Sequence, residues 1–342
     1  MRGMKVEISI LALAAALALA PGVAGADGVE SFKDWTVVCD NLRNCQVAGF
    51  AADDTELPAV LRLSRAAAAS APAKVEIDLL GEISLGGKAP ALAVDGRVVM
   101  TAKVVSSRDS ADFTVVLDDA QVGPLLGAAR NGTLLSIQDS GKELGRVSLA
   151  GMVAALRYAD DQQKRAGTVT AMVAKGAAPA ASVPAPPPAP VLRAAPAVAQ
   201  TGLPAKPPAA IKALFSKAEC DLGPGRDDKP EAFRLSADKV LWQVPCWGAA
   251  YNFGSLFVIA DKADRLSLAL EGVGDGVLVN AEYDPKTRLL SAYNKGRGIG
   301  DCGDSSQWVW TGEAFALSEA TVMPVCRGYG GDWPTTFHAE VR

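Results

Sequence analysis

The chain has 342 residues, of which 49% are hydrophobic, and its formal net charge is −4. This length and composition suit a globular protein that can bury two separate cores. The negative charge disfavours a nucleic-acid partner, because binding to phosphates requires a basic surface.

Residues 1–26 have the pattern of a cleavable export signal. Arg2 and Lys5 precede an apolar run at 8–20, and Ala24-Gly25-Ala26 offers small residues for cleavage. The run is shorter than the roughly 20 apolar residues that a membrane-spanning helix needs, and no later stretch is apolar enough to span. We therefore expect an exported, periplasmic protein without a membrane span.

Residues 27–175 are expected to form a β-rich, sandwich-like domain with two helices. β-branched and aromatic residues predict strands at 35–39, 45–50, 60–63, 74–80, 91–94, 97–105, 113–117, 134–137 and 144–149. Asp95-Gly96 predicts a tight hairpin turn between two of them.

Two helices are expected in this domain. Apolar residues at helical spacing predict the first over 120–130. Ser148 could cap the second, which continues through Leu156. Pairing of Asp160 with Lys164 and of Asp161 with Arg165 would support its exposed end.

Residues 176–210 consist largely of Ala, Pro and Val. Such a stretch cannot pack a core, and prolines favour extended conformations. We expect a disordered, semi-stiff linker that leaves the relative orientation of the two domains undefined.

Residues 211–342 are expected to form an all-β domain, an antiparallel meander or barrel. Turn signals separate predicted strands at 233–235, 240–244, 251–259, 266–270, 277–283, 288–293, 307–311, 314–317 and 337–341. The sequence therefore predicts a mainly β protein.

Six cysteines allow 15 disulfide pairings. If each domain closes its own bridges, Cys39 pairs with Cys45 and the second domain keeps three choices, of which we favour the nearest neighbours, Cys220 with Cys246 and Cys302 with Cys326. A metal site is not expected, because no C-x-x-C spacing occurs and the only histidine is remote from the cysteines.

Glycines are densest between residues 295 and 304, where Gly298, Gly300 and Gly303 form a formal G-x-G-x-x-G. A dinucleotide site would need a following helix, and none is indicated, so no cofactor is expected. Two interpretations stay open. In one, Arg297 pairs with Asp301 or Asp304 in a turn. In the other, the loop is a recognition surface on which Arg297 binds a carboxylate or phosphate and aromatic residues stack on the ligand.

The candidate binding residues are Arg297, Asp301, Asp304, Trp310 and Trp333. Trp308 and Trp310 would share one face of a strand, which is typical of a core but also of a sugar-stacking platform. No residue is assigned as catalytic, because the chain has no nucleophile elbow, while a pair of carboxylates stays possible.

Two family resemblances add to this interpretation. The first domain resembles the invasion-associated locus B family through Trp35-Thr36-Val37-Val38-Cys39, 134–137 and 147–152. The whole mature chain resembles the bacterial periplasmic family known as domain of unknown function 1176. The residues that carry it lie at 32–35, Cys39, Cys45, 245–246, 248–252, 295–303 and 333–334. This resemblance implies a periplasmic protein without an established activity.

The resulting hypothesis is a non-catalytic binding or envelope-associated module with an unidentified envelope protein or glycan as its partner. A cell-envelope hydrolase with paired carboxylates and an inhibitor of another secreted enzyme are the alternatives.

Overall fold

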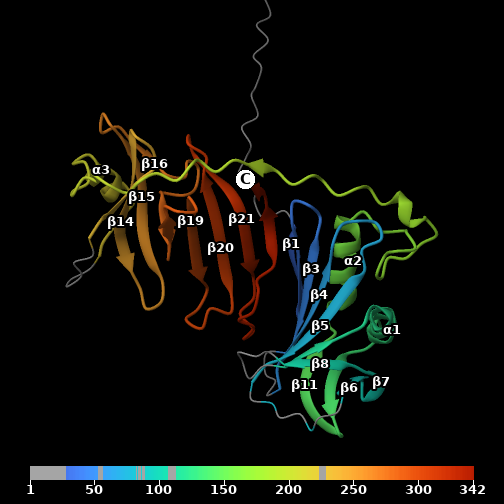
Figure 1. Cartoon of the computed structure of the whole chain (residues 1–342). Coiled ribbons are helices and arrows are strands. Elements are labelled where there is room, and N and C mark those ends of the chain that lie inside the picture. Colours follow the sequence, from blue (N-terminus) through green and yellow to red (C-terminus); the bar gives the residue numbers. More distant parts are fainter. Residues whose placement is uncertain are drawn as a thin grey trace, which may run out of the picture.

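The computed structural model describes residues 28–52, 57–81, 83, 86, 89–106, 113–222 and 229–342, and the predicted export signal lies outside these residues. The protein is mainly β, with antiparallel sheets arranged in two halves that lie side by side (Figure 1).

The first half contains two antiparallel sheets. One has seven strands in the order β1-β2-β3-β4-β5-β9-β8, with bounds Val29–Phe32, Trp35–Cys39, Cys45–Phe50, Ala59–Arg65, Ala73–Leu79, Phe113–Val116 and Lys103–Ser106. The other has the order β11-β10-β6-β7, with bounds Lys142–Ser148, Leu134–Asp139, Ala91–Val94 and Arg97–Thr101. The predicted strand 97–105 is therefore divided, because β7 and β8 join different sheets.

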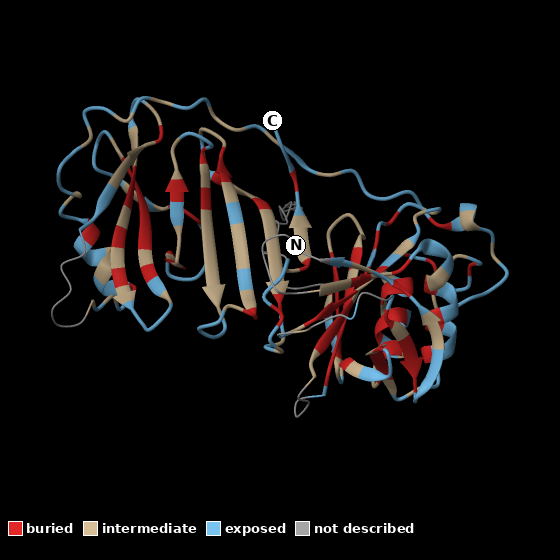
Figure 2. Ribbon diagram, turned by 60° about the horizontal axis from the view of Figure 1, so that its bottom comes forward, coloured by how far each residue is buried: buried red, intermediate tan, exposed pale blue. Residues whose placement is uncertain are grey.

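Two helices complete this half, as predicted. α1 (Asp119–Ala129) and α2 (Met152–Gln162) bury their apolar residues in a core shared with both sheets (Figure 2). The predicted cap at Ser148 is wrong, because the residue before the helix is Gly151, at φ 100°. A Cβ there would lie 1.8 Å from the carbonyl oxygen of Phe32, so only glycine fits this close approach.

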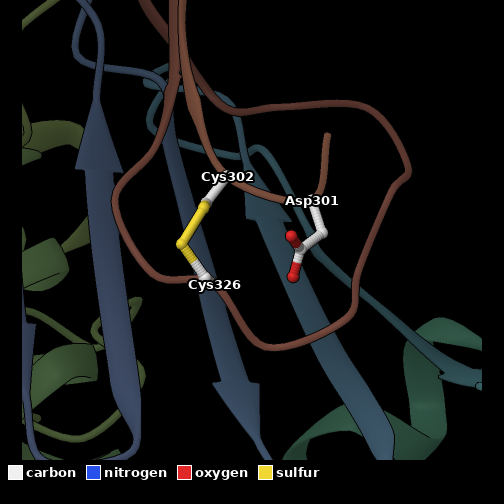
Figure 3. A group of neighbouring side chains, drawn as sticks. All are labelled: Asp301, Cys302 and Cys326. Atoms are coloured by element: carbon white, nitrogen blue, oxygen red, sulfur yellow. A yellow bond between two sulfur atoms is a disulfide. The ribbon is translucent and has the colours of Figure 1, made fainter. Parts of the chain in front are cut away.

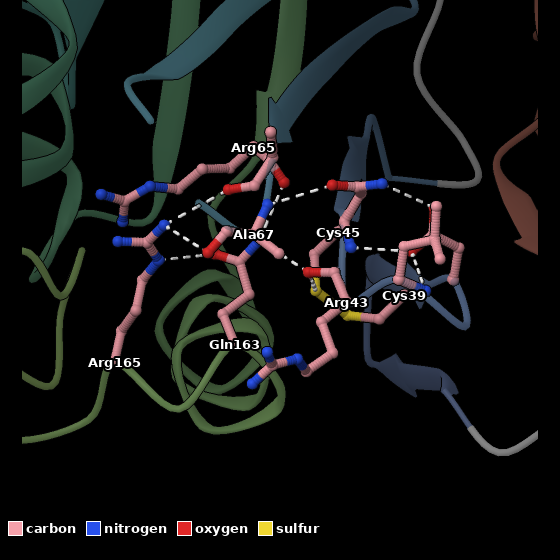
Figure 4. Close-up of a disulfide and its surroundings, with 11 residues drawn as sticks. Cys39, Arg43, Cys45, Arg65, Ala67, Gln163 and Arg165 are labelled. Carbon is pink, nitrogen blue, oxygen red and sulfur yellow. Dashed lines mark hydrogen bonds between the residues drawn. A yellow bond between two sulfur atoms is a disulfide. The ribbon is translucent and has the colours of Figure 1, made fainter. Parts of the chain in front are cut away.

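The surface ion pairs predicted at the end of α2 are also wrong. Asp160 and Arg165 are fully buried. The Asp160 carboxylate accepts hydrogen bonds from three consecutive backbone N–H groups of 172–174, at 2.8 to 3.1 Å. The guanidinium of Arg165 donates to the carbonyls of 66–69, as Figure 4 shows in part. Lys164 at φ 58° ends the helix and turns the chain inward, which carries Arg165 into the interior.

Residues 176–210 form an extended strap along both halves rather than a spacer without contacts (Figure 1). In its middle, β12 (Val191–Leu192) pairs in parallel with β23 (Glu340–Val341). On the side of the first half, Arg43 donates hydrogen bonds to the carbonyls of Pro184 and Ala185. An extended proline-rich backbone keeps free carbonyls and some free N–H groups, and a neighbouring strand edge can pair with them.

The second half contains two further antiparallel sheets. One joins β13 (Glu231–Arg234), β14 (Lys239–Gly248), β15 (Phe253–Asp261), β16 (Leu266–Leu268) and β17 (Val277–Val279). The other is a meander of β18 (Glu282–Asp284), β19 (Leu289–Lys295), β20 (Gly303–Trp310), β21 (Phe315–Met323) and β22 (Thr335–His338). Apolar residues of both sheets share one core.

Two details of the prediction for this half differ in the structure. A short helix, α3 (Ile211–Lys217), contacts the first sheet, where Ile211 packs with Trp242 and Leu256. The predicted strand 277–283 is divided between β17 and β18, which belong to different sheets.

The two halves are packed against each other, contrary to the expectation of an undefined orientation. Ala48, Phe50 and Val60 of the first half share a buried cluster with Cys302, Met323 and Tyr329 of the second. The guanidinium of Arg62 lies 5.5 Å from the centroid of the Tyr329 ring. Apolar burial and a cation–π contact therefore fix one half on the other.

The three disulfides of the structure are the nearest-neighbour pairs that the sequence favoured. They join Cys39 with Cys45, Cys220 with Cys246, and Cys302 with Cys326. The first closes the β2–β3 hairpin, and each of the others closes a loop within the second half.

Candidate functional site

The glycine-rich segment forms the loop between β19 and β20, and an ion pair closes it. Arg297 donates from Nε and Nη2 to the two carboxylate oxygens of Asp301, at 2.7 and 2.5 Å. The Asp301 side chain is 1% exposed, whereas that of Arg297 is 47% exposed. The backbone N–H of Gly328 donates to the same carboxylate at 2.6 Å. The turn interpretation, in which Arg297 pairs with Asp301, describes this geometry.

The pair has an electrostatic consequence. The hydrogen bonds from Arg297 hold the pKa of the Asp301 carboxyl below its usual range, and the N–H of Gly328 acts in the same direction. The Asp301 carboxylate is therefore a permanently ionised, buried acceptor in neutral solution. The Asp301 carboxylate neutralises Arg297 and accepts from its Nε and Nη2, so Arg297 offers an incoming carboxylate or phosphate less charge than an unpaired arginine would.

A disulfide fixes the same loop from the other side (Figure 3). Asp301, Cys302 and Cys326 place one potential ligand atom each within 4.8 Å of one another. Both sulfurs, however, are bonded to each other. Cysteine binds a metal ion as a thiolate, so these two cysteines cannot act as ligands while the bridge is closed.

An aromatic pair lies beneath the loop. The rings of Tyr293 and Trp333 have centroids 5.0 Å apart and planes inclined by 34°. The Tyr293 hydroxyl donates to the carbonyl of Gly300 at 3.2 Å. The ammonium of Lys295 lies 5.8 Å from the centroid of the Tyr293 ring. These contacts hold the loop in place. Trp333 is half-buried and supports the loop through the ring of Tyr293.

A second loop, at 249–252 between β14 and β15, meets the first. Asn252 donates from Nδ2 to the carbonyl of Lys295 at 2.9 Å. A Cβ built on Gly298 would lie 3.4 Å from the Tyr251 ring, so the ring and the glycine are in contact. Tyr251 is 38% exposed and Ile299 is 72% exposed. We call the patch formed by Tyr251, Lys295, Arg297 and Ile299 the two-loop surface.

The structure gathers only some of the predicted binding residues. Arg297, Asp301 and Trp333 lie at or below the two-loop surface, and Asp304 is exposed on β20, where it accepts a hydrogen bond from Asn294 at 3.1 Å. Trp310 is fully buried at the opposite end of β20 and packs on Phe315. It belongs to the core, which corrects its assignment to the binding site.

The sequence placed Ile299 within the candidate loop 297–304 without singling it out, and it assigned Tyr251 no place in the site. Tyr251 was placed at the start of a strand, whereas β15 begins at Phe253 and leaves Tyr251 in the turn. Both residues lie in segments that carry the family resemblance, 248–252 and 295–303. Nothing in the sequence shows that these two segments meet.

These features define a β-rich protein of two packed halves, with three disulfides and a braced loop surface. The chain belongs to the family described as Protein of unknown function (DUF1176), which it matches over residues 29–340. It is 32% identical over 328 residues to the Uncharacterized protein YpfG of Escherichia coli (strain K12), an alignment covering 90% of this chain and 91% of that protein. Among solved structures, the crystal structure of invasion associated protein b from Bartonella henselae is similar at 18% identity and a TM-score of 0.31, over 40% of this chain and 98% of that chain.

No helix within the described residues is long and apolar enough to cross a membrane.

Proposed function

We propose that this protein is a non-catalytic module of the bacterial periplasm that binds another protein of the cell envelope through the two-loop surface. The observation that carries the proposal is Ile299, an aliphatic side chain 72% exposed at the tip of a loop. Exposed apolar groups are common singly, but this one lies in a loop that also carries Lys295 and Arg297 and that contacts the ring of Tyr251 through Gly298. Aromatic and arginine side chains around an apolar anchor are typical of protein interfaces.

Rigidity of the loop supports the same function. The Cys302–Cys326 bridge, the Arg297–Asp301 pair and the Tyr293 hydroxyl each hold it in place. A preformed loop loses little conformational entropy when a partner binds, so more of its contact energy appears as affinity. The neutralisation of Arg297 by Asp301 favours a protein partner over capture of a small anion at this place.

Export is part of the proposal. Disulfides persist in oxidising compartments such as the periplasm and are rare in the cytosol. Every cysteine of the described residues is in a bridge. The amino-terminal pattern of an export signal agrees with this compartment.

Site-specific photocrosslinking tests the proposal. A benzophenone amino acid placed at position 299 of the full chain should give one discrete protein adduct in envelope extract of the source organism. The same probe at position 273, where Val273 is 36% exposed outside the patch, is the control and should give none. Tyr251→Ala should reduce the adduct from position 299 several-fold without changing the melting temperature. No adduct at 299, or an equal adduct at 273, would refute the proposal. An adduct with a secreted enzyme would favour the inhibitor alternative.

A hydrolase remains the second candidate because one hollow gathers carboxylates. Glu231, Glu282 and Asp284 line a hollow of about 540 Å³ in the second half. Hydrogen bonds from the backbone of Lys286 and the hydroxyl of Thr287 lower the pKa of Asp284, which suits a base but not a general acid. Glu231 and Glu282 are exposed, whereas a general acid at neutral pH needs an apolar environment.

The hydrolase therefore ranks behind the binding module. Release of soluble glycan from purified sacculi, abolished by Glu282→Gln at an unchanged melting temperature, would reverse that order.

A further inference from the structure

The first half has a hollow that the two-loop surface does not involve. It measures about 300 Å³ and lies between α1 and the segment 169–175. Its apolar wall includes Val122, Leu126, Met172 and Val173, and its cations are Arg65, Arg130 and Lys175. No Asp or Glu lines it among the described residues. The hollow is therefore amphipathic, with a positive charge and an apolar wall.

Arg65 is the buried cation of this hollow. It is 8% exposed, and it donates from Nε to the carbonyl of Ala71 at 3.0 Å and from Nη1 to that of Thr170 at 2.7 Å. In the described part of the chain, no hydrogen bond uses its Nη2. Arg65 thus keeps donor capacity beside an open volume.

The surroundings of Arg65 carry excess positive charge. Burial, and next the charge of the neighbouring Arg165, lowers the pKa of Arg65 to about 10. Asp160 is the buried carboxylate near both, and its two oxygens already accept three backbone N–H groups. A guanidinium stays protonated in neutral solution, so the cost of burying this charge remains until an anion approaches.

Helix α1 leaves room for an apolar group. Gly123 and Gly127, one turn apart, both line the hollow, and a Cβ on either would meet no atom within 4 Å. A glycine in a helix interior is less favourable than alanine, because its backbone loses more conformational freedom. The helix thus carries two unfavourable residues where side chains would narrow the hollow.

We propose that this hollow is a binding site for a small amphipathic anion, with its acidic group against Arg65, Arg130 and Lys175 and its apolar body against α1. The ligand class is a carboxylate on a short apolar chain. A volume of about 300 Å³ is at the lower end of known small-molecule sites, which limits the ligand to a single short chain. The inference goes beyond the proposed protein-binding function and does not depend on it.

Calorimetry with the full chain tests the site, with octanoate as the probe. We expect octanoate to bind at least ten-fold more tightly than 1-octanol, octylamine and inorganic phosphate. Equal binding of 1-octanol would overturn the role of the cations, and equal binding of phosphate would overturn that of the apolar wall. No binding of octanoate would overturn the whole proposal.

Two variants of α1 locate the site. Gly127→Leu should weaken octanoate binding at least ten-fold, because its side chain occupies the open volume. Ala128→Leu, an exposed position on the same helix outside the lining, should bind like the wild type. Both replace a small residue by a good helix former, so both should fold. Unchanged binding by a folded Gly127→Leu would refute the location, and Lys175→Gln should weaken binding several-fold.

Discussion

Replacement of Arg165 by methionine should destabilise the first half by about 3 kcal/mol. The guanidinium is fully buried and donates to the carbonyls of Ala68 and Ala69, at 2.5 and 2.8 Å, and at longer distance to Ala66 and Ala67. Hydrogen bonds to a charged group contribute about 1.5 to 3 kcal/mol each. Methionine keeps most of the side-chain volume, so the replacement leaves no large cavity. The expected loss of stability is that of the two short hydrogen bonds, at about 1.5 kcal/mol each. Removal of Arg165 also relieves its repulsion with Arg65 and ends its attraction to Asp160, two effects of opposite sign.

Urea unfolding followed by circular dichroism measures this loss, and hydrogen exchange read by mass spectrometry locates it. Arg157→Met is the matched control, because Arg157 is exposed on α2 and its replacement should cost no more than about 0.5 kcal/mol. Exchange should accelerate in peptides covering 66–71 in the Arg165 variant and not in the control. The reasoning fails if both variants unfold at the same urea concentration, or if 66–71 stays equally protected.

Three further predictions concern the second half. Arg297→Gln should lower the urea midpoint at pH 7. Because the pKa of Asp301 is depressed in the folded state, the stability that it contributes is present above about pH 4 and is lost as the pH falls through the folded pKa. The gap between variant and wild type should therefore close in acid, and an equal gap at pH 7 and pH 3 would contradict this. Replacement of Cys220 and Cys246 by serine should cost about 3.5 kcal/mol for a separation of 26 residues, measured by the same unfolding, and a loss below about 1 kcal/mol would contradict the loop-closure argument. Burial raises the pKa of Tyr329 to about 12, so the wild type should lose stability between pH 10 and pH 12, and Tyr329→Phe should lose less in the same titration.

Local sequence signals located most strands and their turns. Asp95-Gly96 predicted the hairpin between β6 and β7, and both residues have positive φ, at 48° and 79°, as a two-residue turn requires. The divisions within 97–105 and 277–283 were not predictable. In each case the chain changes sheet inside one β-favourable run, and the pairing partners that decide this lie far away in the sequence.

The candidate site was partly predictable for the same reason. Arg297 and Asp301 are four residues apart in one loop, so their pairing is local and the sequence included it among its alternatives. The contact between Tyr251 and Gly298 joins two hairpins and depends on the packing of one sheet on the other. The shared face of Trp308 and Trp310 indicated burial but could not show that Trp310 lies at the end of β20 away from the loop.

The loop and the interface between the halves share the same supports. Cys302 is bridged to Cys326 and also lies in the apolar cluster with Phe50 and Tyr329. The Asp301 carboxylate accepts the N–H of Gly328, next to Tyr329. The disulfide and this hydrogen bond therefore order both the two-loop surface and the contact with the first half.

Replacement of both Cys302 and Cys326 by serine should consequently have two effects at once. The loop should exchange its amides faster, and the edge of the first half around Phe50 should lose protection with it. Removal of the Cys39–Cys45 bridge is the control, because that bridge closes the β2–β3 hairpin at the end away from Phe50. It should loosen that hairpin end and leave the loop unchanged. If loss of the Cys302–Cys326 bridge affected the loop alone, the orientation of the halves would rest on their other contacts, among them Arg62 on Tyr329, Asn41 with His338 and Arg327 with Asp34. The two-loop surface would then be mechanically separate from the first half.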